Sequence, residues 1–486
     1  MHEETSPLLG SVHFGASQWS PSFLTCLVTC NFLLAASGAF LSLPLIRLIE
    51  DNLCRRTTEQ GSSIDERLCK TDQIQSELAY LNGSLLLVEA LVGLVVAFPF
   101  GALADRVGRK PIILFSTVGS QLALAWELSI IALQDTVPVQ LVLAGPLFNM
   151  VGGGSTVQVA NLYSIASDLV PETERASAFF LMVLASLAGA SVGPVISARL
   201  MDIFSPWIPA MIGFFALPIG LTVLAFIPES FSPLKRDVFP EHDNHLGSEE
   251  QPKCSTTFKL HLFQSLHLLK SCLATLKSTS IIIVLATFLT RMPEHLATSQ
   301  FLAQYISKRF DWPLARTGYL LTVRGIIHLV VLSLALPWLS KLLLRRQRPA
   351  SKDLTLARFS AVLAAAGAFA MGASQMSLVF FGLVLQSLGA GLAPLCRSLA
   401  ISLVAPQDTS KLNTLIGIVE TVSMLFAGPV LACLFEIGMK LSGLSLGLPY
   451  FSLAGSFLLC VVGLLFVRAP SEPGTDRLRG GSDGDE

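Results

Sequence analysis

The chain has little charge and none of the short motifs that mark the commonest enzymes. Only 14% of its 486 residues are Asp, Glu, Lys or Arg, whereas an ordinary soluble domain has roughly 25%. It contains no Gly-x-x-x-x-Gly-Lys phosphate loop, which argues against direct use of ATP. No Cys/His spacing is typical of a zinc site, and no nucleophile–base motif stands out. We therefore expect no enzyme, no cofactor or metal, and no nucleic-acid partner.

Apolar residues make up 52% of the chain and are gathered in long blocks. A helix needs about 20 apolar residues to cross a bilayer, and twelve blocks approach or exceed that length. They cover residues 22–46, 78–103, 112–133, 138–167, 176–200, 207–228, 279–305, 314–340, 357–376, 377–404, 412–437 and 449–468. The pattern predicts an all-α integral membrane protein with about twelve transmembrane helices. A proline-started polar turn with a cation follows both the fourth and the tenth block, so we expect two pseudo-symmetric six-helix bundles.

A long polar break separates the sixth block from the seventh. We expect a cytoplasmic tail at 1–20, a six-helix bundle at 21–228, a cytoplasmic linker at 229–278, a second bundle at 279–470 and a tail at 471–486. The first part of the linker has a composition typical of disorder, and its second part has the apolar spacing of a helix lying on the membrane surface. The inner loops are rich in Lys and Arg while short outer loops lack them, which favours both termini inside.

The most specific motif is the loop between the second and third blocks, Gly-Ala-Leu-Ala-Asp-Arg-Val-Gly-Arg-Lys-Pro at 101–111. It resembles the loop signature that follows span 2 in the major facilitator superfamily, whose members are twelve-span secondary transporters. The resemblance implies the major facilitator fold and a loop that controls the interchange of access states. The gating residues that it implies here are Gly101, Asp105, Arg106, Gly108 and Arg109.

Two further segments resemble family motifs. Residues 168–175 resemble the span 4–5 turn of tetracycline-type exporters, which implies that Asp168 pairs with Arg109 or Arg106 and that Arg175 belongs to the gate. Residues 189–194 resemble the antiporter signature of span 5, which implies close helix packing at Gly189 and Gly193 and a bend at Pro194. The arginine that proton-coupled drug exporters usually carry in span 4 is replaced here by Asn149 or its neighbour Phe148.

Charged and polar side chains in the middle of the blocks mark a possible pathway for substrate and protons, because such groups are costly in a membrane. Two clusters share helix faces in the seventh and eighth blocks, and a proline lies inside the first cluster. The alternative is an ion-pair network that only holds the bundle together. The pathway candidates are Arg291, Glu294, His295, Arg324, His328, Glu89, Asn149, Gln158 and Asn161. Glu127, Glu420 and Arg397 are isolated charges that can also serve helix packing.

Cys54 and Cys69 both fall in residues 50–77, which we interpret as a solvated outer loop with charges of both signs. That side of a membrane permits disulfides. Because pairing cannot be deduced from spacing alone, both a bridge and two free thiols remain open.

The leading prediction is a secondary transporter that moves a small organic molecule by alternating access, similar to twelve-span exporters of drugs and fungal secondary metabolites, with proton coupling. The alternatives are a proton-coupled importer of a nutrient or organic anion, and a membrane sensor that does not transport. We expect a monomer in the lipid bilayer of the plasma membrane. The segment Glu4-Thr-Ser-Pro-Leu-Leu9 resembles an acidic dileucine signal and keeps a vacuolar or endosomal membrane open.

Overall fold

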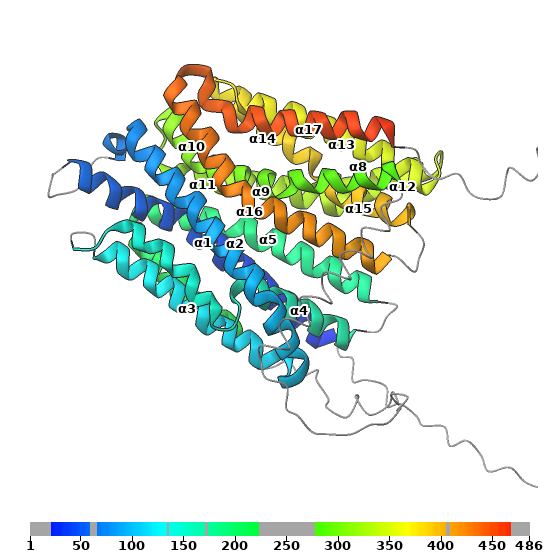
Figure 1. Ribbon diagram of the computed structural model, residues 1–486, viewed down its shortest axis with the longest axis horizontal. Helices are drawn as coiled ribbons and strands as arrows, with labels where there is room; N and C mark the ends of the chain where they lie inside the picture. Colours follow the sequence, from blue (N-terminus) through cyan, green and yellow to red (C-terminus); the bar gives the residue numbers. More distant parts are fainter. Residues whose placement is uncertain are drawn as a thin grey trace, which may run out of the picture.

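The computed structural model describes residues 21–58, 66–133, 136–170, 174–222, 278–404 and 409–467, and these residues form helices and turns without a strand. The N-terminal half consists of α1 (Pro21–Thr58), η1 (Glu66–Cys69), α2 (Asp72–Val107), α3 (Arg109–Ala132), η2 (Val139–Met150), α4 (Gly154–Leu169), α5 (Arg175–Ile203) and α6 (Trp207–Thr222). Figure 1 shows this half, blue to green, below the C-terminal half, green to red. The expected tails, the linker and its surface helix lie outside the described residues.

The C-terminal half continues the helical bundle. It consists of α8 (Thr279–Thr287), η5 (Phe288–Thr290), α9 (Arg291–Ser299), α10 (Phe301–Phe310), α11 (Leu314–Val330), η6 (Val331–Ala335), α12 (Leu336–Leu344), α13 (Pro349–Met371), α14 (Met376–Leu388), η7 (Gly389–Gly391), α15 (Leu392–Ser402), α16 (Thr409–Leu441), η9 (Gly443–Gly447) and α17 (Leu448–Phe466). Within the described residues, ten helical segments are long and apolar enough to cross a membrane. Two further expected spans correspond to η2 with α4 and to α6, so the predicted all-α membrane fold is confirmed.

The prediction of an outer loop at 50–77 is wrong over much of that range, because much of it is helical. Helix α1 runs on to Thr58, and α2 already begins at Asp72. The charged residues stay helical because they pair along α1: Arg47 contacts Glu50 at 2.7 Å and Arg55 contacts Asp51 at 2.9 Å. Pairs three and four residues apart lie side by side on a helix. The sequence pattern suggested solvated charges, whereas the structure uses them to extend the helix.

Several expected single spans are interrupted. The fourth span breaks between η2 and α4, where three consecutive glycines take positive φ angles of 86°, 93° and 62°. Residues with a Cβ rarely adopt that backbone, so the glycine run ends the first segment. The seventh span breaks at η5, and the eighth contains the π-helical turn η6.

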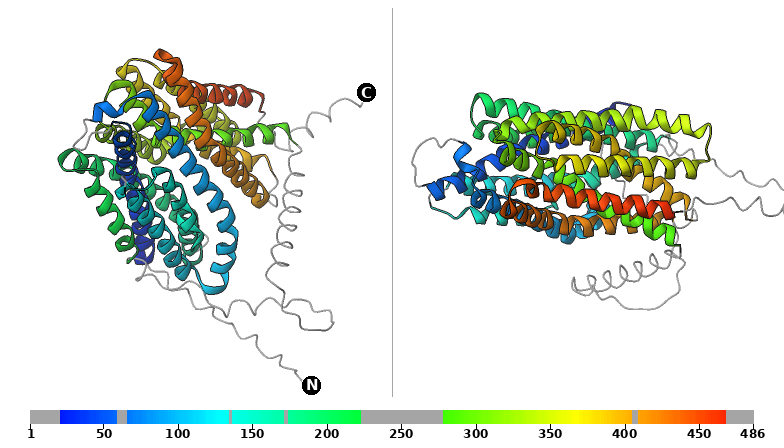
Figure 2. Two further views of the ribbon diagram at one scale, coloured as in Figure 1. Left: turned by 60° about the vertical axis from the view of Figure 1, so that its left-hand side comes forward. Right: turned by 90° about the horizontal axis from the view of Figure 1, so that it is seen from above.

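The two halves pack through α2 against α16 and through α5 against α11. A Cβ added at Gly83 of α2 would lie 2.9 Å from both Ala432 and the Gly428 carbonyl of α16. At the other end of the same two helices, a Cβ at Gly101 or Gly417 would meet no atom within 4 Å. The halves therefore touch closely at one end, which we call the disulfide end because Cys54 and Cys69 lie there. Figure 2 shows the two halves side by side in two further views.

Candidate functional site

The first cluster of pathway candidates sits where the seventh span is interrupted. Pro293 has no N–H to bond the carbonyl of Leu289, four residues earlier. That carbonyl accepts a hydrogen bond of 2.6 Å from the Ser423 hydroxyl of α16 instead. The 3₁₀ turn η5 and the proline together begin α9 in the middle of the bundle. Arg291, Glu294 and His295 project from this first turn and the next.

Glu294 is held by an amide rather than by a cation. The Nε2 of Gln386 on α14 donates a hydrogen bond to its Oε1, and Gln386 is completely buried. The charges of Arg324 and Arg291 act on Glu294 from α11 and α9, but among the described residues neither lies within 4 Å of its carboxylate. Glu294 is therefore a carboxylate with a hydrogen-bond donor but no ion-pair partner in the described part of the chain.

Arg291 turns to a different acid. It forms an ion pair with Glu420 of α16, and Arg397 of α15 contacts the same carboxylate oxygen at 3.4 Å. Glu420 therefore ties three helices of the C-terminal half together. The sequence named these charges separately, but spacing along one chain could not show that two arginines from different helices meet on one acid.

Arg324 and His328 lie one turn apart on α11. Arg324 shows no ion pair in the part of the chain that the structure describes, and its buried Nε has no hydrogen-bond partner. The Nε2 of His328 and the Oε1 of Gln386 are also buried without a partner. Buried polar atoms are normally paired, so these three atoms have hydrogen-bonding capacity that the described residues leave unused. Sequence analysis missed Gln386, since one amide in an apolar helix carries no distinctive pattern.

In the N-terminal half, two of the three polar pathway candidates of the fourth span are hydrogen-bonded within the protein. Gln158 and Asn161 are buried and donate to the Thr117 hydroxyl at 3.2 Å and to the Val157 carbonyl at 2.9 Å. The Oδ1 of Asn149 stays unpaired. The ligand contacts expected at all three therefore have geometric support only at Asn149, and they stay a prediction.

Glu89 of α2 and Glu127 of α3 lie on neighbouring helices of the N-terminal half. Neither forms an ion pair with a cation among the described residues. Glu127 also lies against η2, because a Cβ added at Gly145 would come within 2.8 Å of its Oε1. The two acids thus belong to the interior of the N-terminal half, among α2, α3 and η2.

The loop signature forms a sharp corner between α2 and α3. Gly108 has a φ of 106°, which favours glycine, and it separates the two helices. Arg109 forms an ion pair with Asp168 at the end of α4, whereas Arg106 is exposed. Of the two partners that the resemblance implied, the structure pairs Asp168 with Arg109. The side chain of Asp105 lies outside the described residues, and the gating roles stay predictions.

The antiporter-like motif packs α5 onto α1. A Cβ at Gly189 would lie 2.4 Å from the Phe32 carbonyl, and one at Gly193 would lie 2.6 Å from the Ala36 carbonyl. The carbonyl of Pro194, inside α5, faces Gly318 of α11 across the two halves. The Nε of Arg175, the first residue of α5, is buried without a partner. The motif thus sets helix approach within the N-terminal half and borders its seam with the other half.

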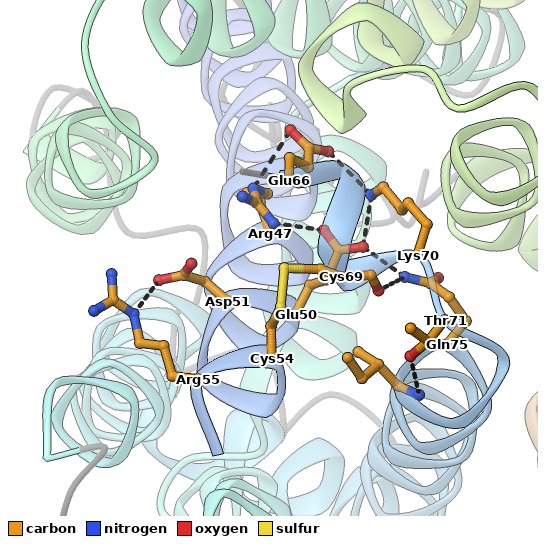
Figure 3. The surroundings of a disulfide bond; sticks show 11 residues. Arg47, Glu50, Asp51, Cys54, Arg55, Glu66, Cys69, Lys70, Thr71 and Gln75 are labelled. Carbon is orange, nitrogen blue, oxygen red and sulfur yellow. Dashed lines mark hydrogen bonds and ion pairs between the residues drawn. A yellow bond between two sulfur atoms is a disulfide. The ribbon is translucent and has the colours of Figure 1, made fainter. Parts of the chain in front are cut away.

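Cys54 and Cys69 form a disulfide with an S–S distance of 2.16 Å, and both are completely buried (Figure 3). The bridge joins the last turns of α1 to η1. Beside it lies Glu50, also completely buried, which contacts Arg47 at 2.7 Å and Lys70 at 2.6 Å. The interpretation of Glu50 as a solvated charge is wrong, because its negative charge is compensated by two cations inside the fold.

Comparisons with known proteins agree with the fold and the loop signature. The family model of the Major Facilitator Superfamily matches residues 73–357, more than half of the chain. The chain is 29% identical over 455 residues to the MFS efflux pump atnC of Emericella nidulans, covering 90% of this chain and 86% of that protein. It is 27% identical to the MFS-type transporter aprT of Aspergillus flavus, covering 92% of this chain and 88% of that protein.

Solved structures show the same architecture at lower identity. A D-xylose–proton symporter superposes with a TM-score of 0.63 at 14% identity, covering 92% of this chain and 98% of that chain. The human organic anion transporter MFSD10 superposes with a TM-score of 0.57 at 17% identity, covering 91% of this chain and 98% of that chain. At such identities the likeness concerns the fold alone.

Proposed function

Because the chain belongs to the major facilitator superfamily and is a membrane transporter, we propose that it exports a small organic molecule in exchange for protons. Alternating access moves the molecule, and the two halves are the rigid parts that rock against each other. The relatives that bear the names efflux pump and transporter support export. We place the protein in the plasma membrane, as a monomer.

The observation that carries proton coupling is the state of Glu294. Glu420, the other acid of the C-terminal cluster, forms ion pairs with Arg291 and Arg397, whereas among the described residues Glu294 has only the Gln386 amide within hydrogen-bond distance. A proton can therefore bind Glu294 without breaking an ion pair.

A second candidate is symport of an organic anion with protons. It is favoured by Arg324, whose ion-pairing capacity is unused among the described residues, and by the unpaired His328 Nε2 beside it. An acidic group of a substrate would compensate the guanidinium, since a positive charge inside a membrane normally has a counter-ion. The two candidates differ in the sign of coupling rather than in the site.

Reconstituted vesicles distinguish the two. Purified protein in proteoliposomes receives a pH gradient and is offered a panel of neutral, acidic and basic solutes, including fungal secondary metabolites. Antiport predicts that solute accumulates in the more acidic compartment, and symport predicts the opposite. For one proton per solute, each pH unit supports up to about tenfold accumulation, because one unit corresponds to ~1.4 kcal/mol. Solute movement that never responds to the gradient would contradict proton coupling.

A further inference from the structure

The residues around the disulfide make contacts that the transport site does not explain. The segment Glu66–Asp72, which we call the braced segment, comprises η1, Lys70, Thr71 and the first residue of α2. The disulfide fixes its Cys69 to Cys54 of α1. Glu50, which precedes the segment in the chain, and Gln75, which follows it, complete its attachment to the N-terminal half (Figure 3).

Glu50 anchors the braced segment by several bonds at once. Its Oε1 accepts hydrogen bonds of 2.6 Å from Lys70 Nζ and from Gln75 Nε2. The same Gln75 Nε2 lies 3.1 Å from the Cys69 carbonyl, to which it also donates. Because Glu50 is completely buried, each of these bonds lies where water cannot replace it. The braced segment is therefore a rigid part of the N-terminal half.

The braced segment also contacts the C-terminal half directly. Glu66 Oε1 accepts a hydrogen bond of 2.8 Å from the backbone N–H of Leu314, the first residue of α11. A carboxylate at that position satisfies a free N–H and interacts favourably with the positive end of the helix dipole. Glu66 is thus shared, since Lys70 of its own half contacts the same oxygen at 3.0 Å.

Lys308 at the end of α10 completes the contact. Its Nζ forms an ion pair with Asp72 and donates a hydrogen bond to the Lys70 carbonyl. One turn away, Gln304 is almost completely buried and donates a hydrogen bond of 2.7 Å to the Gln75 carbonyl. The positive end of α11 and a lysine of α10 therefore meet acids and carbonyls of the braced segment across the seam.

We propose that the braced segment is the outer gate of the transporter, a preformed unit that docks onto the start of α11 and the end of α10 and must release them before the protein opens outward. The orientation expected from the basic loops puts this end outside, where a disulfide is stable. Because the disulfide and Glu50 hold the segment as one body, its bonds to the C-terminal half break together rather than one by one. The inference goes beyond the proposed function, because it needs alternating access but neither export nor proton coupling.

The test measures how often the disulfide end opens. Ser191 of α5 is buried against Gly325 of α11 at the seam, and Ser191→Cys changes only one atom. A membrane-impermeant maleimide is added to the outer face of vesicles that carry the Ser191→Cys protein. The protein also carries Cys433→Ser, which removes an exposed free cysteine. Modification of the peptide containing position 191 is followed by mass spectrometry, so that other thiols do not interfere.

Two pairs of variants in this background decide the proposal. Glu66→Gln and Lys308→Gln each remove the charge of a side chain that bonds to the opposite half. Glu77→Gln and Arg309→Gln are matched controls, because Glu77 bonds Gln140 within the N-terminal half and Arg309 bonds Tyr305 within the C-terminal half. We expect the first pair to be labelled at least ~threefold faster than the controls, because each loses a charge-assisted hydrogen bond between the halves. Equal labelling rates in the two pairs would overturn the proposal.

The disulfide is tested with Cys54→Ser/Cys69→Ser. We expect faster labelling, and adding Glu66→Gln should increase the rate less than the product of the separate effects, because both changes act through one segment. If the effects of the two changes on the labelling rate multiply, the disulfide and Glu66 do not act as one unit. That result would overturn the proposal that the braced segment is the outer gate. If the cysteine variant does not fold, the Glu66 and Lys308 variants still decide whether the segment is a gate.

Discussion

The two halves of the molecule have the same architecture but distribute charge in different ways. In the C-terminal half, acids and arginines from four helices share one region, where Glu420 binds two arginines and Glu294 binds an amide. In the N-terminal half, Glu89 and Glu127 form no ion pair among the described residues, and the Gln158 amide bonds to the Thr117 hydroxyl within the protein. On the proposed function, this comparison predicts a division of labour, in which the C-terminal half carries the proton site and the N-terminal half supplies a packed frame.

The largest expected effect is the loss of pH-driven accumulation when Glu294 of the C-terminal half is replaced. Glu294→Gln removes the titratable group but keeps an oxygen that can accept from Gln386. We predict that accumulation driven by one pH unit falls from about tenfold to none, a loss of ~1.4 kcal/mol, while exchange at equal pH persists. Proteoliposome flux measures both quantities.

Glu89→Gln is the matched control in the N-terminal half, and we expect it to retain accumulation. If Glu89→Gln abolished accumulation and Glu294→Gln did not, the proton site would lie in the half that we assign to the frame. Loss of exchange as well as accumulation in Glu294→Gln would assign that residue to substrate binding.

The next effect compares the stability of two variants, one with an acid replaced in each half. Glu420→Gln leaves Arg291 and Arg397 without their common partner, so we predict a free energy of unfolding lower by about 1 kcal/mol, because both arginines are partly exposed. Glu127→Gln, in contrast, breaks no ion pair with a described residue and should leave the stability unchanged. Thermal unfolding in one detergent compares the two variants, and a Glu127→Gln protein that is the less stable one would contradict the contrast.

The smallest expected effect concerns the ion pair between Arg109 and Asp168, for which we predict a gating role. Asp168→Asn removes the partner of Arg109 in an ion pair whose acid is more than a third exposed. Exposed pairs contribute roughly 0.2–1 kcal/mol, so we predict transport slowed by about 1.4- to fivefold at unchanged expression. Arg106→Gln changes a neighbouring exposed arginine and should leave the rate near that of the unaltered protein. Equal slowing in both would show that loop charge matters and the pair does not.

By itself the sequence determined the membrane-spanning class, the division into two groups of helices and the loop between α2 and α3, because these depend on local composition and on glycines needed at one corner. It also located Glu294 and Arg324, since charges in apolar blocks stand out. Only the tertiary structure decided which charges meet. Glu420 lies far along the chain from Arg291, Gln386 has no distinctive pattern around it, and Glu50 resembled a solvated acid until the fold enclosed it with Arg47 and Lys70. Long-range pairing depends on how helices pack, and packing is not encoded in the spacing within any one helix.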